Sequence, residues 1–318
     1  FFMVLHSINT YKEAAVTVVI LLIVSVAVAF IGIFQFFLFP ISELTAGGTT
    51  ATAGFGRANT LADFYLIVTG LTLGMVMYLK EKRKVFLALI TMSVFIFAIV
   101  MTKSRGAYVS LPPLFFAAYL ISRKTKILFF AVSLILVFIV YYASIFLSGD
   151  AAEILVKRHH EDIKGQFISI GSVAAKGPEA DSSFNARYTA WRDITPKIFE
   201  YPLLGHGVGA MRLGYLDNQY VHEAYDSGII GLMALLYMNF VIFMAVLGFF
   251  YATDDPLSKS LSLGFIAGQA GMLVHGMSMT NFYTILNMEA FWLILALIMA
   301  LYYNEMLKKK TVPNGVPG

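Results

Sequence analysis

The chain has 318 residues, of which 58% are hydrophobic and only 13% are charged, and its mean hydropathy is +0.75. One water-soluble core cannot take up so large an apolar fraction, so these values exclude an ordinary soluble protein and predict an integral membrane protein. The formal net charge of +4 is small for this length and argues against a nucleic-acid partner, while the lack of cysteine excludes disulfides and thiolate metal sites.

Eight apolar runs are long enough to cross the roughly 30 Å hydrocarbon layer of a bilayer as helices. They cover 14–38, 61–79, 85–102, 106–121, 127–147, 223–251, 258–278 and 286–304. The sequence therefore predicts an all-α fold, a polytopic transmembrane bundle of about eight spans that forms a single membrane domain over 1–318.

The cationic residues divide unequally between the two sides of these spans. If eight spans alternate, one side holds Lys12, Lys80, Lys82, Arg83, Lys84, Arg123, Lys124, Lys126, Lys259, Lys308, Lys309 and Lys310. The short loops of the other side hold only Arg57, Lys103 and Arg105. By the positive-inside rule, we predict that both termini are cytoplasmic.

The longest connection, residues 148–221, is then a large loop on the outer face. A loop of this length without a role is uncommon, and we expect two short helices within it. Around Arg187, aromatic and apolar residues recur at helical spacing, which predicts an amphipathic helix lying against the membrane surface. Its stripe is formed by Phe184, Tyr188, Trp191, Ile194 and Ile198.

Several polar residues are placed toward the outer face by this orientation: Arg57, Arg105, Arg187, Asp217, His222, Asp226 and His275. Arg105, in MTKSRGAYVSLP, lies between two spans, and is either an anion ligand facing the bundle or a side chain that snorkels to the interface. Arg187 is either part of the buried stripe or a surface charge.

The stretch YPLLGHGVGAMRLGYLDNQYVHEAYDSGIIGL, residues 201–232, leads into the sixth span. Its glycine-rich GHGVG is a linker, or a turn whose amides bind a phosphate. Asp217 is either a functional carboxylate or the N-cap of the following helix. His222 and Asp226 are four residues apart, so that the carboxylate could orient the imidazole on one helix face.

A second histidine-containing stretch, KRHHED at 157–162, has side chains that can bind a metal. The two histidines are adjacent and no second ligand cluster is evident, so a solvated charge run is the better interpretation. No metal or cofactor is expected.

These motifs, in their order and on one side of the membrane, resemble the superfamily of O-antigen polymerases and O-antigen ligases, of the Wzy and WaaL type. The resemblance rests on SRGAYVSL, then ARYTAW and YPLLGHGVG in the large loop, then DNQYVHEAYDSGIIGL, and it extends from GRANTLADFYL to VHGMSMTNFY. Such proteins are similar to polytopic glycosyltransferases of the GT-C class. They act without a metal on glycans carried by undecaprenyl pyrophosphate, at the outer face of the bacterial inner membrane.

The resemblance implies that Arg105 and Arg187 hold the pyrophosphate, with Arg57, Asn218, Asp226 and His275 as secondary candidates. A leaving diphosphate needs fixed cations, and guanidinium groups bind it bidentately without a metal. The partners implied are the lipid-linked glycan, the bilayer and a candidate chain-length regulator. Family members generally have more than eight spans, so helices upstream of Phe1 are expected.

One departure from the family pattern favours a polymerase. Ligases of this superfamily carry His-Asn before the helix, whereas the matching dipeptide here is Asp217-Asn218, and Asp226 stands at the usual glutamate position. The general base is therefore Asp217 or His222.

Two alternatives to the polymerase remain. A ligase would transfer glycan to lipid A core. A transporter of a lipid or solute would need polar residues at mid-membrane and an internal repeat, neither of which the sequence indicates.

Overall fold

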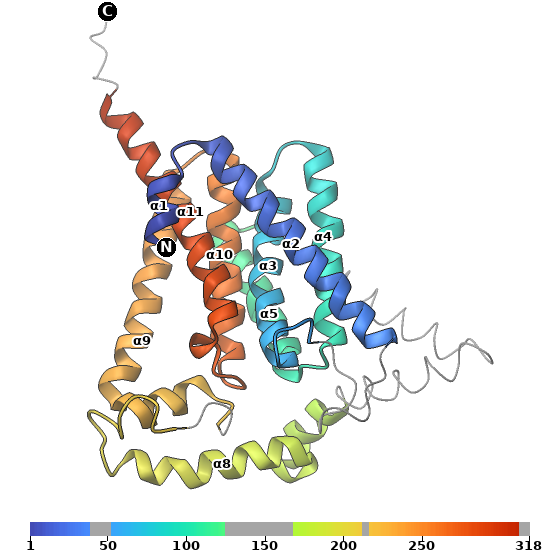
Figure 1. The fold of residues 1–318 in the computed structure, drawn as a ribbon, viewed down its shortest axis with the longest axis vertical. Coiled ribbons are helices and arrows are strands. Elements are labelled where there is room, and N and C mark those ends of the chain that lie inside the picture. The colour runs from blue at the N-terminus through green and yellow to red at the C-terminus, as the bar shows by residue number, and fades with distance from the viewer. Residues whose placement is uncertain (39–51, 125–167, 212–215, 312–318) are drawn as a thin grey trace, which may run out of the picture.

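The computed structural model describes residues 1–38, 52–124, 168–211 and 216–311. Over these ranges the regular structure is entirely helical, without a β-strand (Figure 1). The protein is thus a polytopic helical bundle, which confirms the predicted fold class. The run 127–147 and the KRHHED stretch lie outside the described residues.

Long helices form at the other seven predicted spans, and their first residues agree with the predicted starts within four residues. The helices in chain order are α1 (Phe2–Ser7), α2 (Tyr11–Leu38), α3 (Ala58–Tyr78), α4 (Lys82–Met101), α5 (Arg105–Ser122), α8 (Ser182–Ile198), α9 (Gln219–Ala252), α10 (Pro256–His275) and α11 (Ile285–Thr311). Two 3₁₀ turns, η1 (Pro178–Ala180) and η2 (Asn281–Tyr283), and a helical stretch over 168–176 complete the described structure. The large loop therefore contains short helices, as predicted.

Within the described residues, five helices are long and apolar enough to cross a membrane: α2, α3, α4, α9 and α11. The helices α5 and α10 occupy predicted spans but are not in this set. Helix α10 packs against α3, α5, α9 and α11, so its buried Ser258, Ser262 and Gln269 face other helices. A helix in the centre of a bundle can carry polar residues that lipid contact would forbid.

Helices α3 and α10 form the centre of the bundle through facing glycines. A Cβ atom on Gly70 would stand 2.5 Å from the carbonyl oxygen of Gly264 and 2.5 Å from the amide nitrogen of Gly268. Because these positions lack side chains, the two backbones approach closely, as is typical of helix pairs in membranes.

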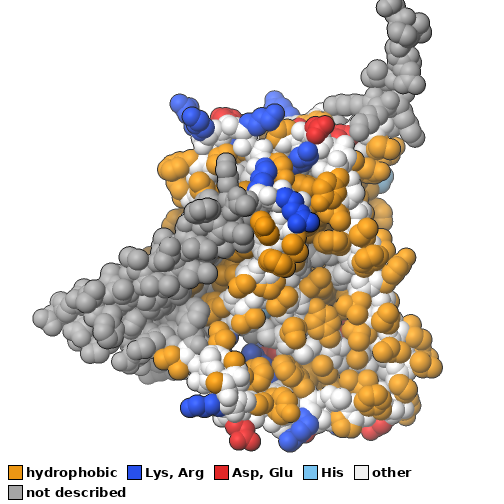
Figure 2. Space-filling model, turned by 180° about the vertical axis from the view of Figure 1, so that it is seen from behind, with side chains coloured by type: hydrophobic (Ala, Val, Ile, Leu, Met, Phe, Trp, Pro, Cys, Tyr) orange, Lys and Arg blue, Asp and Glu red, His pale blue; other side chains and the backbone are white. Residues whose placement is uncertain are grey.

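The flank of the bundle is apolar and its two ends are charged. Figure 2 shows hydrophobic side chains over the flank, between two ends that carry Lys, Arg, Asp and Glu. Helix α8 lies across one end, while the connections from α3 to α4 and from α9 to α10 lie at the other (Figure 1). The lysine-rich loop between α3 and α4 and the site of α8 are therefore on opposite sides, as the charge pattern predicts.

Candidate active site

Helix α8 is the platform of the candidate site. The Asp181 carboxylate caps it by accepting a hydrogen bond from the Phe184 amide (2.8 Å). Its apolar face packs on the start of α9 through a small cluster in which Ile194, Met211 and Leu216 are buried and Trp191 is partly buried. Tyr188, expected on the same stripe, is 44% exposed and lies outside this cluster.

Asp217 joins two arginines from distant parts of the chain. Its Oδ1 accepts a hydrogen bond from Arg57 Nη1 at 3.1 Å, and its Oδ2 accepts one from Arg187 Nη2 at 3.4 Å. Arg57 precedes α3, Arg187 lies on α8, and Asp217 precedes α9. Three of the predicted site residues therefore meet at one point, with two positive charges around one carboxylate.

Asn218, and not Asp217, is the N-cap of α9. Its Oδ1 accepts the amides of Tyr220 (3.0 Å) and Val221 (3.2 Å). The alternative interpretation of Asp217 as the cap is thus wrong, because the side chain of Asn218 accepts the hydrogen bonds of these helix amides. Asp217 is left available for the arginines, and its side chain is 21% exposed.

Arg105 occupies a second position on the same platform. Its Nη1 lies 2.6 Å from Asp181 Oδ2 and donates to Ser169 Oγ, whose hydroxyl donates to Asp181 at 2.7 Å. Asp181 and Arg187 are six residues apart, which is about 9 Å along the helix axis. Arg105 and Arg57 therefore contact two different carboxylates, Asp181 and Asp217, at separate points of the α8 end.

The Asp181 carboxyl, at this end of the bundle, has a strongly shifted pKa. Burial on its own would raise its pKa. The hydrogen bonds from Arg105, the Phe184 amide and Ser169, together with the charge of Arg105, outweigh this effect and lower the pKa to about 2. Asp181 is thus a fixed anion that holds Arg105 in place.

His222 is buried beside the site, with a side chain only 1% exposed. Neither ring nitrogen has a hydrogen-bond partner among the described residues, and the ring lies on that of Tyr283, with centroids 4.6 Å apart. Its Nδ1 is 3.9 Å from Asp226 Oδ2, which is too long for a hydrogen bond. The expected orientation of His222 by Asp226 is therefore not formed in this structure.

Asp226 instead holds the glycine-rich loop. Its carboxylate accepts the amides of Gly209 (2.8 Å) and Met211 (2.9 Å), and its backbone carbonyl accepts the Gly207 amide (2.9 Å). Of the GHGVG amides that were candidates for a phosphate, that of Gly209 thus binds a carboxylate, and those of Gly205, His206 and Gly207 bind backbone carbonyls. The loop is a folded connector, and Asp226 serves it structurally.

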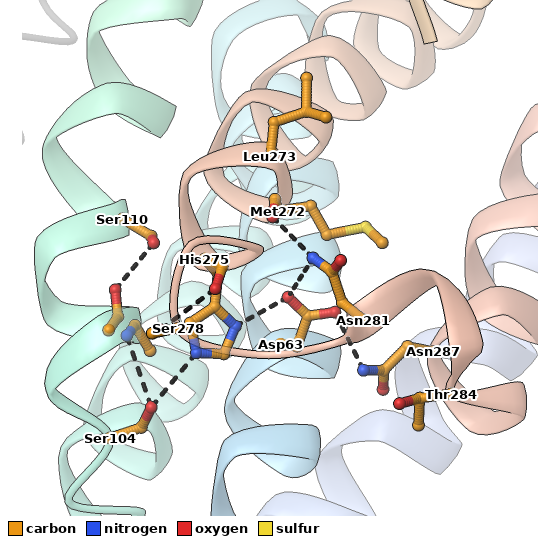
Figure 3. A network of polar contacts seen from close by, with 12 residues as sticks. Asp63, Ser104, Ser110, Met272, Leu273, His275, Ser278, Asn281, Thr284 and Asn287 are labelled. Carbon is orange, nitrogen blue, oxygen red and sulfur yellow. Dashed lines mark hydrogen bonds and ion pairs between the residues drawn. The ribbon is translucent and has the colours of Figure 1, made fainter. Parts of the chain in front are cut away.

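His275 belongs to a buried network that joins α3, α5, α10 and α11. Figure 3 shows this network. Its Nδ1 donates to Asp63 Oδ1 (2.8 Å), and its Nε2 is 3.3 Å from the hydroxyl of Ser104, the N-cap of α5. Asn281 and Asn287 donate to the same carboxylate at 3.4 and 2.9 Å. Because His275 and Asp63 are fully buried, this predicted site residue binds helices together and does not line the outer surface.

Sequence reasoning missed Asp63, Asp181 and Ser169. Asp63 carried a usable signal, because a lone acid within an apolar span is expensive unless it is paired. The partners of Asp181 could not be anticipated, since Arg105 is far from it in sequence. Within the described residues, no three His, Asp or Glu side chains gather as a candidate metal site.

Comparison with known proteins identifies one family. Residues 90–236 match a family model described as O-antigen ligase. The matched region contains Arg105, Arg187, Asp217, His222 and Asp226, and it supports the superfamily that the motifs resemble. No curated protein matches the chain.

Proposed function

We propose that this membrane protein, whose residues 90–236 match a family model described as O-antigen ligase, polymerises glycan repeat units linked to undecaprenyl pyrophosphate, as O-antigen, capsule or exopolysaccharide. The observation that carries the proposal is the bridge that Asp217 forms between Arg57 and Arg187. A reaction that expels a diphosphate and deprotonates a hydroxyl group uses both kinds of side chain.

In the proposed reaction, the acceptor hydroxyl oxygen forms a bond to the anomeric carbon of the donor glycan. The bond from that carbon to the phosphate oxygen breaks, and undecaprenyl pyrophosphate leaves with the electron pair. The hydroxyl proton passes to the base. Guanidinium groups stabilise the charge that grows on the leaving diphosphate, so that the step proceeds without a metal.

The structure suggests how the base becomes available. Both carboxylate oxygens of Asp217 accept hydrogen bonds from arginines. A diphosphate that binds Arg57 and Arg187 competes with Asp217 for these donors, and so releases the carboxylate beside the reacting hydroxyl. Arg105, held by Asp181, supplies a further cation on the same platform.

His222 is the alternative base. Neither ring nitrogen has a partner among the described residues, so the unprotonated one can take a proton, but the side chain is buried and an acceptor would reach it only after a rearrangement. Asp217 is accessible without such a change, and we therefore assign the proton transfer to Asp217.

We further propose that the protein resides in a bacterial inner membrane, with both termini in the cytoplasm and the α8 end on the outer face. The charge distribution supports this orientation. The lipid-linked glycan reaches the site from the bilayer, and no cofactor takes part. A chain-length regulator is a candidate partner in the cell.

The second candidate is an O-antigen ligase, which the description of the matched family favours. It would use the same donor and pass the glycan to lipid A core. Asp217-Asn218, in place of the His-Asn of ligases, is the feature that favours the polymerase.

The two candidates differ in their products. Purified protein in detergent is incubated with a synthetic undecaprenyl-pyrophosphate glycan and a chelator, with or without lipopolysaccharide core. A ladder formed without core supports a polymerase, whereas one shifted band that requires core supports a ligase. No product in either reaction, from protein that elutes as a folded species, would contradict both.

A further inference from the structure

The loop that directly follows α8 exposes an unusual number of apolar side chains. We define the 199–208 loop as FEYPLLGHGV. Leu204 is 75% exposed and Val208 is 85% exposed, and the loop also exposes Phe199, Tyr201 and Leu203. Residues 201–210 include no Asp, Glu, Lys or Arg. Loops in water are polar at their tips, so a contiguous apolar surface of this kind indicates a partner.

The loop is folded against α9, so its apolar side chains are held outward. The Ile229 amide donates to the Pro202 carbonyl (2.9 Å), and the Ile230 amide donates to the Leu203 carbonyl (3.3 Å). The helix is kinked here because Gly228 adopts φ 66° and ψ −168°, which frees these amides from the helix ladder. Gly205 and Gly228 pack backbone to backbone, because a Cβ atom on either glycine would collide with the backbone of the segment that contains the other.

The apolar surface continues from the loop onto the flank of α9. Directly after the kink, Ile229, Ile230 and Met233 are half exposed, and the first two adjoin the loop through their backbone hydrogen bonds. Helix α9 is one of the candidate spans, and only 11% of its apolar window is buried inside the protein. Its free flank is therefore a lipid-facing surface, and the loop extends this surface at the α8 end.

The polar neighbours place the loop at the border between lipid and water. Charged side chains stand on the last turns of α8, at Arg192, Asp193 and Lys197, and at the beginning of the loop, at Glu200. Tyr201 lies between these charges and the leucines. Tyrosine is enriched at membrane interfaces, where its ring faces lipid and its hydroxyl group faces water.

We propose that the 199–208 loop inserts into the bilayer interface at the α8 end, so that lipid covers Leu203, Leu204 and Val208. This inference does not depend on the reaction. If the proposed function also holds, a further consequence follows, because the loop ends at the amides of Gly209 and Met211 that Asp226 binds. The bilayer would then set the height of the α9 start, and of Asp217, relative to a lipid-linked phosphate.

The chain lacks cysteine, so single-cysteine variants can be labelled without background. Leu204→Cys and Val208→Cys are labelled with an NBD fluorophore and reconstituted in phosphatidylcholine vesicles. Ile230→Cys on α9 is the lipid-facing control, and Arg192→Cys on α8 is the water-facing control. Lipids with a doxyl quencher near the headgroup or deep in the acyl chain report depth, and iodide reports contact with water.

We expect that NBD at Leu204 and Val208 loses fluorescence to the shallow doxyl lipid, as at Ile230, and resists iodide. NBD at Arg192 should show the reverse. Quenching of the two loop positions by iodide to the same extent as Arg192 would overturn the proposal. Protection from both iodide and doxyl lipid would also overturn it, because protein would then cover the loop. The readout needs no activity, so its failure is distinct from failure of the proposed reaction.

Discussion

At the scale of single residues, the arginines of this protein differ in their contacts and in their exposure. Arg187 is 25% exposed and shares the Asp217 carboxylate with Arg57. Arg192, five residues farther along the same helix, is 68% exposed and forms an ion pair with the adjacent Asp193. Arg187 is held in a cluster in which positive charges outnumber negative ones. Arg192 is an ordinary surface cation.

This pair supplies a matched test of diphosphate stabilisation. Arg187→Ala should lower the rate of glycosyl transfer by roughly 10²–10³-fold, the usual cost of removing one donor to a developing anion. Arg192→Ala should leave the rate unchanged. The measurement is initial rates with the lipid-linked glycan. Equal rates for both variants would remove Arg187 from the proposed site.

Asp181 allows a test by pH. Its folded-state pKa of about 2 lies below the ordinary aspartate value of roughly 3.9, so its pairing with Arg105 stabilises the fold above that value. The contribution is lost as the pH falls through about 2. The apparent Tm of the wild type should therefore exceed that of Asp181→Asn by a constant margin from neutral pH down to about 5, and the margin should shrink below about 4.

The control for this series is Asp193→Asn, an exposed carboxylate on the same helix, which should change the apparent Tm little. A margin for Asp181→Asn that grows as the pH falls would contradict the assignment of Asp181 as a fixed anion.

At the scale of elements, the kink divides helix α9 into two parts with different roles. The part before Gly228 carries Asn218, His222 and Asp226 beside α8, and the part after it crosses the membrane. Only glycine adopts the Gly228 conformation at little cost. The 199–208 loop accepts hydrogen bonds from the amides that the kink frees.

Gly228→Ala should therefore destabilise the protein by about 1–3 kcal/mol from backbone strain, and by more if the contact with the Leu203 carbonyl is not relieved. Gly248→Ala is the matched control on the same helix. No described atom lies within 4 Å of its added Cβ, so it should be neutral or stabilise by roughly 0.5–1 kcal/mol. Thermal unfolding in detergent compares the two variants. Equal stability would show that the kink is not built into the fold.

Helices could be predicted well from the sequence where the length of a hydrophobic run alone determines them. The starts of α2 to α5 and of α9 to α11 follow from runs of hydrophobic residues between charged loops. The capping of α9 could not be resolved, because Asp217 and Asn218 are both good N-caps and only the positions of Arg57 and Arg187 decide between them. The role of Asp226 was hidden for a similar reason, since its partners are backbone amides about fifteen residues earlier.

At the scale of the whole molecule, two sets of polar residues do different work. The set at α8 (Arg57, Arg105, Asp181, Arg187, Asp217) is partly exposed and holds unlike charges. The set around Asp63 and His275 is fully buried and joins α3, α5, α10 and α11. Sequence patterns place both at one end of the spans but cannot separate them, because burial depends on which helices are neighbours.

The orientation of the molecule gives a further prediction. Glu81→Cys lies between α3 and α4, at the end opposite α8, and Arg192→Cys lies on α8. In spheroplasts, an impermeant maleimide should label Arg192→Cys directly and Glu81→Cys only after lysis, because the lysine-rich side is retained in the cytoplasm. The opposite pattern would place the candidate site in the cytoplasm and contradict the proposed route of the substrate.

The most direct test of the account is the transfer rate of Asp217→Asn in a single turnover, with purified protein, the undecaprenyl-pyrophosphate glycan and a chelator. Asparagine keeps the shape of the side chain but cannot take the proton, so we predict a rate about 10²–10⁴-fold below the wild type. Asp193→Asn should react as the wild type does. Full activity of Asp217→Asn, together with loss of activity in His222→Gln, would move the reaction to His222 and contradict the role assigned to Asp217.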